Sequence, residues 1–243
     1  MQNNPRDAGI RDAEIEDKLE AWAASQSDAE LSPELQRKLR DMLASSFKPV
    51  KPVPAQSGLV LRFLCVFAAG AAGLIAIMSR IGLHLMTGAQ IGWMIAALGG
   101  GAILFSLTLA RQMVPGRRQR LPLSLVLGLS GVGTIAAITL NFPWRTSSAF
   151  VSEGWPCASM ELMLAIPAAV VFWLLARRGA LFASARLGAT LAGLAVFMVL
   201  VPLQTQCMFQ QAPHLLVWHG GMAAVLIGSA ALVGEIQRHR WIS

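Results

Sequence analysis

Long apolar segments follow one another from residue 57 to near the end of the chain, with short polar connections between them. They lie near 57–79, 88–110, 121–140, 158–176, 185–206 and 216–235. A helix needs about 20 apolar residues to cross the hydrocarbon core of a bilayer. Inside that core every backbone polar group must be bonded within the protein, which a helix achieves. The pattern therefore predicts an all-α integral membrane protein whose residues 57–243 form six transmembrane helices.

Residues 1–56 are polar and show a different periodicity. Two sets of apolar residues recur there at the spacing of an amphipathic helix. They are Ile15, Leu19 and Trp22 in the first set and Leu31, Leu35, Leu39 and Met42 in the second. Ser32 followed by Pro33 is a typical helix start. The prolines between positions 48 and 54 cannot continue a helix, so they predict an extended linker into the first span.

The two arm helices have too little apolar surface to form a core of their own. One interpretation is a pair of solvated, partly frayed helices. The other is a docking arm that folds against a partner protein. In the second interpretation the partner-binding side chains are Leu19, Trp22, Leu35 and Leu39.

Arginines in the connections between the spans predict the orientation of the chain. Nine of them follow the second, fourth and sixth spans: Arg111, Arg117, Arg118, Arg120, Arg177, Arg178, Arg186, Arg238 and Arg240. The opposite connections hold only Arg80 and Arg145. Connections rich in arginine and lysine stay on the cytoplasmic side of a membrane. We therefore expect a multi-pass protein of the bacterial inner membrane, with both termini and the helical arm in the cytoplasm.

Glycines within the spans are expected to let neighbouring helices approach closely. The glycines in question are Gly99, Gly100, Gly101, Gly128, Gly131, Gly133, Gly220 and Gly221. We assign them a role in packing and none in chemistry.

Composition explains the net charge of +7. Hydrophobic residues make up 55% of the chain and charged residues 14%, whereas soluble domains carry about a quarter charged residues. Ten of the 13 acidic residues precede residue 56, where eight basic residues nearly balance them. The surplus positive charge therefore lies in the membrane connections and not in the basic patch that binds nucleic acid. We expect contact with the lipid bilayer and no direct contact with nucleic acid.

The chain has three cysteines. Cys65 lies inside the first span, where a free cysteine acts as a small buried hydrophobe. Cys157 is expected at the outer start of the fourth span and Cys207 at the outer end of the fifth. Adjacent antiparallel helices would bring these two to the oxidising face of the membrane, where disulfides persist. Three interpretations stay open: a structural disulfide, a redox- or metal-responsive pair, and two unrelated thiols.

Glu161 and His214 are candidate accessory groups for this cysteine pair. Glu161 follows Cys157 by one helical turn, and an ionisable side chain inside a membrane is by default a functional candidate. Two thiolates with these groups can hold a soft cation, so Cys157 and Cys207 are also candidate metal ligands. No CxxC or HxxxH spacing supports the metal site. A lone histidine such as His214 or His219 is more often a hydrogen-bonded residue at the membrane interface than a ligand.

Several of these segments together resemble the NrsF-type membrane anti-sigma factors over about residues 40–241. They are Gly154-Trp-Pro-Cys157, Phe172-Trp-Leu-Leu-Ala-Arg-Arg-Gly179, Ala192-Gly-Leu194, Cys207, Trp218-His219 and the linker Pro49–Pro54. The resemblance implies a six-helix membrane protein whose cytoplasmic arm holds an extracytoplasmic-function sigma factor. It maps two outer cysteines, tied in that family to heavy-metal or oxidative stress, onto Cys157 and Cys207. Met208-Phe209-Gln210-Gln211 departs from the family, which tends to place a proline and an acidic residue there.

An anti-sigma regulator is therefore the expected function, and a small transporter or channel is the alternative. Against transport, the spans carry almost no buried charge beyond Glu161 and no visible inverted repeat with broken helices. A membrane thiol oxidoreductase is disfavoured because the chain has two candidate thiols and no CxxC. No catalytic triad, phosphate-binding glycine loop or zinc motif is visible, so we expect neither an enzyme nor a cofactor.

Overall fold

The computed structural model describes residues 17, 18, 20, 21, 32–46, 55–78, 81–114, 121–177 and 184–242. The chain divides into two units, residues 1–52 and residues 53–243, each of which is described by itself. The described residues form helices and no strands, which confirms the prediction of an all-α protein.

Helix α2 (Pro33–Ser46) is the helix described in full in the first unit. It begins where Ser32 and Pro33 predict a start, and the backbone N–H of Gln36 donates to the carbonyl of Ser32 at 3.0 Å. Leu39 is 38% exposed and Met42 is 62% exposed, so the apolar side of α2 reaches the surface of its unit. Leu19, Trp22 and the side chain of Leu35 lie outside the described residues.

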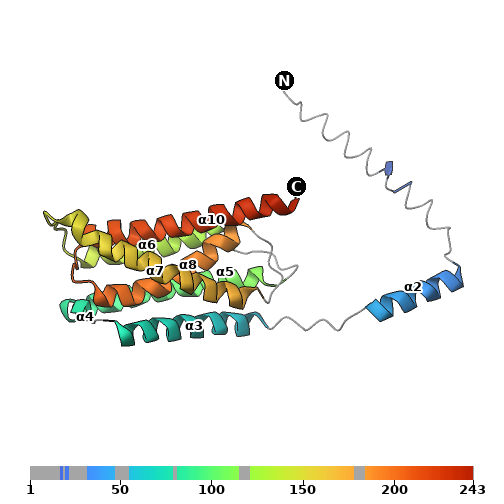
Figure 1. Ribbon diagram of the computed structural model, residues 1–243, viewed down its shortest axis with the longest axis horizontal. Coiled ribbons are helices and arrows are strands. Elements are labelled where there is room, and N and C mark those ends of the chain that lie inside the picture. The colour runs from blue at the N-terminus through green and yellow to red at the C-terminus, as the bar shows by residue number, and fades with distance from the viewer. Residues whose placement is uncertain are drawn as a thin grey trace, which may run out of the picture. The chain divides into compact units, whose positions relative to one another are not determined.

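The second unit contains, among its described residues, six helical segments long and apolar enough to cross a membrane, as the sequence predicts. They are α3 (Gln56–Ile77), α5 (Gly88–Gln112), α6 (Leu123–Asn141), α7 (Phe150–Ala176), α8 (Ala185–Gln206) and a last segment of α9 (Ala212–His214), η1 (Leu215–Gly220) and α10 (Gly221–Ile242). Figure 1 shows these helices side by side in one bundle. A short helix that the pattern did not predict, α4 (Ile81–Leu85), lies between α3 and α5.

The fourth span begins at Phe150, so the expected start at residue 158 is wrong. Polar residues and Pro156 interrupt the apolar pattern there, but the helix continues through them. The backbone N–H of Glu153 donates to the carbonyl of Ala149 at 2.9 Å, which opens the first turn. Cys157 consequently lies about two turns inside α7 and not at its first residue. The last span likewise begins earlier than expected, at Ala212.

Helix α8 forms the centre of the bundle. It packs against α3, α5, α7 and α10, and 89% of its most apolar stretch is buried. In a membrane an apolar helix can face lipid or other helices, so the burial of α8 comes from its packing and not from its composition. Phe197 on α8 meets Phe105 on α5 edge-on, with ring centroids 5.4 Å apart.

Close packing uses a different set of glycines from the one predicted. A Cβ atom at Gly101 would overlap the ring of Phe197, so this glycine behaves as expected. A Cβ atom would meet nothing within 4 Å at the other expected positions within α5 and α6, and only ordinary backbone contacts at the two in the last span. The expectation is therefore wrong for Gly99, Gly100, Gly128, Gly131, Gly133, Gly220 and Gly221. These positions show that glycine content alone does not identify a contact.

Replacing Gly188 by alanine is expected to destabilise the bundle. A Cβ atom at Gly188 on α8 would overlap the carbonyl group of Ala230 on α10. Because the obstacle is backbone, the two helices must separate, at a cost of about 1–3 kcal/mol. Gly228→Ala on α10 is the control, since its Cβ meets nothing within 4 Å. Thermal unfolding in detergent, followed by circular dichroism, should show a lower midpoint for Gly188→Ala alone; equal midpoints would contradict the close approach.

Hydrogen bonds join the connections at one end of the bundle, the end that carries α4 in Figure 1. Thr87 and Gln90 form a capping box at the start of α5. The Gln90 side-chain amide also donates to the carbonyl of Asn141, at the end of α6, at 2.7 Å. The N–H of Ala212 donates to the carbonyl of Pro143 at 3.0 Å. These bonds fix the turn after α8 against the turn after α6.

Candidate functional site

Two cysteines and two histidines meet at this end of the bundle. Cys157 comes from α7, Cys207 from the end of α8, His214 from α9 and His219 from η1. One ligand atom from each, a sulfur or a ring nitrogen, lies within 4.8 Å of all the others. Cys207 is 5% exposed and each histidine 1%. We call these four residues the Cys–His cluster. The structure therefore brings together three residues that the sequence singled out and adds His219.

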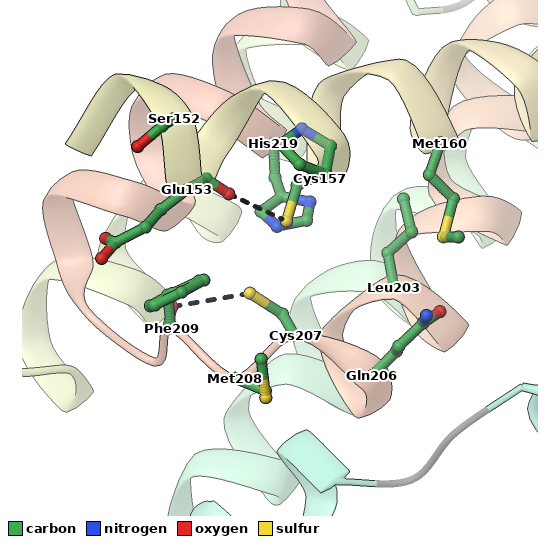
Figure 2. A pocket seen from close by; sticks show the side chains of 11 residues that line it. Ser152, Glu153, Cys157, Met160, Leu203, Gln206, Cys207, Met208, Phe209 and His219 are labelled. Carbon is green, nitrogen blue, oxygen red and sulfur yellow. Dashed lines mark hydrogen bonds between the residues drawn. The ribbon is translucent and has the colours of Figure 1, made fainter. Parts of the chain in front are cut away.

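Helix α7 turns Cys157 toward the end of α8. The Cys157 thiol donates to the carbonyl of Glu153, one turn earlier, at a sulfur–oxygen distance of 3.9 Å, and it faces Cys207 across the site (Figure 2). Gly154 lets α7 pack closely against Trp218, because a Cβ atom at this position would overlap the indole ring. Trp218 immediately precedes His219, so this close approach positions the histidine as well.

Cys207 stands where α8 ends and the chain turns toward α9. Its N–H donates to the carbonyl of Leu203 at 2.8 Å, while its own backbone is extended. The side-chain amide of Gln210 donates to the carbonyl of Cys207 at 2.7 Å and to that of Gln204 at 3.1 Å. Gln210 therefore holds the turn after α8. The Cys207 thiol donates to the carbonyl of Phe209 at 3.6 Å. The Cys157 side chain, followed by burial, raises the pKa of Cys207 above its ordinary value.

His214 and His219 face the cluster together because the chain between them is not an α-helix. In an α-helix, residues five positions apart point about 140° away from each other. The segment η1, Leu215–Gly220, is a π-helical turn with hydrogen bonds between residues five positions apart. One such turn returns to about the same side of the helix. The two imidazole centroids lie 5.7 Å apart, and Phe209 covers His214 at 5.2 Å.

Glu161 lies next to His219 and outside the four-residue cluster. Its side chain is completely buried. A carboxylate oxygen, Oε2, lies 3.7 Å from Nδ1 of His219. Glu161 is therefore placed to act on the cluster through this histidine.

The buried polar atoms of this site have no hydrogen-bond partner among the described residues. Both ring nitrogens of His214, both of His219 and both carboxylate oxygens of Glu161 are in this state. A buried polar group without a partner costs about 1–3 kcal/mol, and native proteins rarely leave several together. Sulfur and imidazole nitrogen are the donor atoms of zinc-type sites. The residues present therefore fit a metal ion.

A cavity of about 430 Å³ adjoins the cluster. Cys157, Cys207 and His219 form part of its wall, and the thioethers of Met160 and Met208 also line it. Figure 2 shows the two cysteine side chains with their sulfurs pointing toward one another. A small solute entering the cavity reaches both thiols, whereas His214 lies outside the lining.

The sequence failed to place His219 for a specific reason. Its spacing of five from His214 matches neither the α-helical ligand pair nor a strand pair. The neighbouring Gly221 and Gly220 hint at an irregular helix, but no sequence signal identifies a π-helical turn.

Comparison with known proteins identifies a family. The family model NrsF, described as negative regulator of sigma F, matches residues 43–241. The matched region covers the linker, all six apolar helices and the Cys–His cluster. It leaves out most of α2 and everything before it. No match was found among curated proteins or among solved structures.

Proposed function

Since the chain belongs to the NrsF family of negative regulators of sigma F, we propose that it is an anti-sigma factor of the bacterial inner membrane. Its cytoplasmic arm sequesters an extracytoplasmic-function sigma factor and so keeps it from RNA polymerase. Cys157 and Cys207 face the periplasm and sense metal or oxidative stress, whereupon the sigma factor is released. The observation that carries the sensing half is the convergence of both thiols on one cavity.

The distribution of charge supports the proposed orientation. Arg111 ends α5, Arg177 follows α7, and Arg186 lies in the first turn of α8. In an antiparallel bundle these positions share the end opposite the Cys–His cluster. Basic residues mark the cytoplasmic side, so the cluster belongs on the periplasmic side.

Signal transfer across the membrane needs an element with two arrangements that the signal can bias. The contact between α7 and α8 is the element we propose. One thiol of the pair belongs to each helix, and both helices continue to the cytoplasmic end. Joining the sulfurs, either through a bound cation or as a disulfide, draws α7 toward the end of α8. Disulfide formation releases two protons and passes two electrons to a peroxide- or disulfide-class oxidant.

The described helices give transport no comparable support. They bury one carboxylate, that of Glu161, and no lysine or arginine. A path for a polar solute would need more buried polar or charged side chains along the bundle.

Capture of a sigma factor by the full-length protein tests the proposal. Membranes that contain the tagged chain should retain one sigma factor from the same genome. Leu39→Asp should abolish retention, because a carboxylate on the apolar side of α2 must then be desolvated in the complex. Arg37→Gln, which changes the net charge by the same amount at an exposed position on the opposite side of α2, is the control. Retention by the Leu39→Asp protein would move the docking surface elsewhere, and no capture by the unmodified chain would refute sequestration.

A further inference from the structure

We propose that Cys157, Cys207, His214 and His219 form a four-coordinate site for a divalent cation of the zinc or cadmium class, with Glu161 holding His219 in place. This inference names the signal of the proposed sensor. The effect of the ion on the sigma factor rests on the proposed function, whereas binding of the ion does not.

The donor set favours a soft or borderline divalent cation. Two sulfurs and two imidazole nitrogens are a common tetrahedral set for Zn²⁺. Thiolates select against hard cations such as Mg²⁺ and Ca²⁺, which prefer oxygen. The two thiolates carry the charge that neutralises the dication. Binding therefore releases two thiol protons and buries no net charge. A neutral complex suits a site whose histidines are 1% exposed.

The geometry is close to that of a bound state. Zn–S bonds of about 2.3 Å and Zn–N bonds of about 2.0–2.1 Å place neighbouring ligand atoms of a tetrahedron about 3.3–3.8 Å apart. The four ligand atoms here lie within 4.8 Å of one another. Binding needs a contraction of about 1 Å, and less for the larger cadmium ion. Only Cys157 comes from α7, so the contraction draws that helix toward the other three ligands.

Glu161 lies beside His219, on the side of the ring that carries Nδ1. Metal-bound histidines usually donate their second ring N–H to a carboxylate, which fixes the tautomer and the ring orientation. Oε2 of Glu161 is 3.7 Å from Nδ1 of His219, which leaves Nε2 for the ion. Glu161 is thus a positioning residue. This role explains why a carboxylate is buried beside His219 with no other polar partner among the described residues.

A disulfide alone does not account for the cluster. It would join two sulfurs and leave four buried imidazole nitrogens without partners. It would also leave unexplained why the π-helical turn brings His214 and His219 to the two cysteines. Coordination of an ion accounts both for the ring nitrogens that lack partners and for the π-helical turn.

Titration of the purified full-length chain tests the site. The protein is kept in detergent with a phosphine reductant and freed of metal. Co²⁺ is added, followed by Zn²⁺ or Cd²⁺ as competitor. We expect one Co²⁺ per chain, with thiolate charge-transfer absorption and the intense visible bands of tetrahedral cobalt, and full displacement by either competitor. Cys207→Ser should lower the charge-transfer absorption because one of the two thiolates is gone, and His214→Asn and His219→Asn should each lose the tetrahedral spectrum.

The chain supplies a matched control for each ligand type. Cys65→Ser, His84→Asn and His239→Asn change residues of the same types that lie outside the cluster, and these three proteins should bind Co²⁺ like the unmodified chain. Glu161→Gln should keep the tetrahedral spectrum and bind about 10–100-fold more weakly, the usual effect of losing such a carboxylate. Circular dichroism of each metal-free variant checks that the helices are retained.

Two outcomes would overturn the site: no Co²⁺ binding by the folded chain, or binding with an unchanged spectrum in His219→Asn. Loss of sigma-factor capture with metal binding intact would instead refute the proposed function and leave the site standing. A chain that captures the sigma factor but binds no metal would refute the site alone.

Discussion

Cys207→Ser is expected to repress its sigma factor normally and to release it under neither cadmium nor oxidant stress. Serine keeps the size and the hydrogen bond of the thiol, which donates to the carbonyl of Phe209, so the fold and the arm should be unaffected. Serine forms neither a disulfide nor a strong bond to a soft cation. Transcription from a promoter dependent on the sigma factor should therefore stay at its uninduced level under both treatments.

Three companion variants make this result specific. Cys157→Ser should behave as Cys207→Ser does, because joining the two helices requires both sulfurs. Cys65→Ser should respond normally, since Cys65 lies on α3 outside the cluster, where it is exposed and not buried as the sequence predicts. His219→Asn should lose the cadmium response and keep the oxidant response. Normal induction by both treatments in Cys157→Ser or in Cys207→Ser would remove the cysteine pair from the sensing mechanism.

Gly154→Ala is expected to disrupt the site from outside the ligand set. A Cβ atom at position 154 would overlap the indole of Trp218, and the ring of Phe150, one turn earlier on α7, also packs against that indole, with centroids 5.8 Å apart. The indole must therefore move and take the adjacent His219 with it. We expect the bundle to lose about 1–3 kcal/mol of stability. Cobalt affinity should fall by about tenfold or more, equivalent to at least 1.4 kcal/mol.

A double variant separates this contact from a general effect of alanine. Gly154→Ala combined with Trp218→Ala should recover much of the stability that the first change removes, because the overlapping ring is absent. Residues in direct contact show such non-additivity, whereas distant ones add. Gly73→Ala on α3, where a Cβ meets nothing within 4 Å, is the control for alanine itself. Additive losses in the double variant would show that Gly154 and Trp218 do not pack as described.

Much of the fold follows from the local composition of the chain. Burial in lipid requires about 20 consecutive apolar residues, so the six spans stand out without any knowledge of packing. The start of α2 was predicted from Ser32 and Pro33 because capping is a local property. The start of α7 was missed, since Glu153 and Pro156 resemble a loop by composition but sit in a helix that tertiary contacts hold.

The sequence by itself determined that this protein is an all-α membrane bundle, that Cys157 and Cys207 approach the same end, and that Glu161 is a buried acid worth attention. Only the tertiary structure decided which residues join them. His219 enters the cluster through a π-helical turn, and Gly154 is needed because Trp218 lies against it. Apolar composition shows which segments enter the membrane, but it does not separate residues that face lipid from those that face protein, because both surroundings are apolar. It carries no information on which distant side chain a residue meets, since that depends on how α7, α8 and η1 pack together.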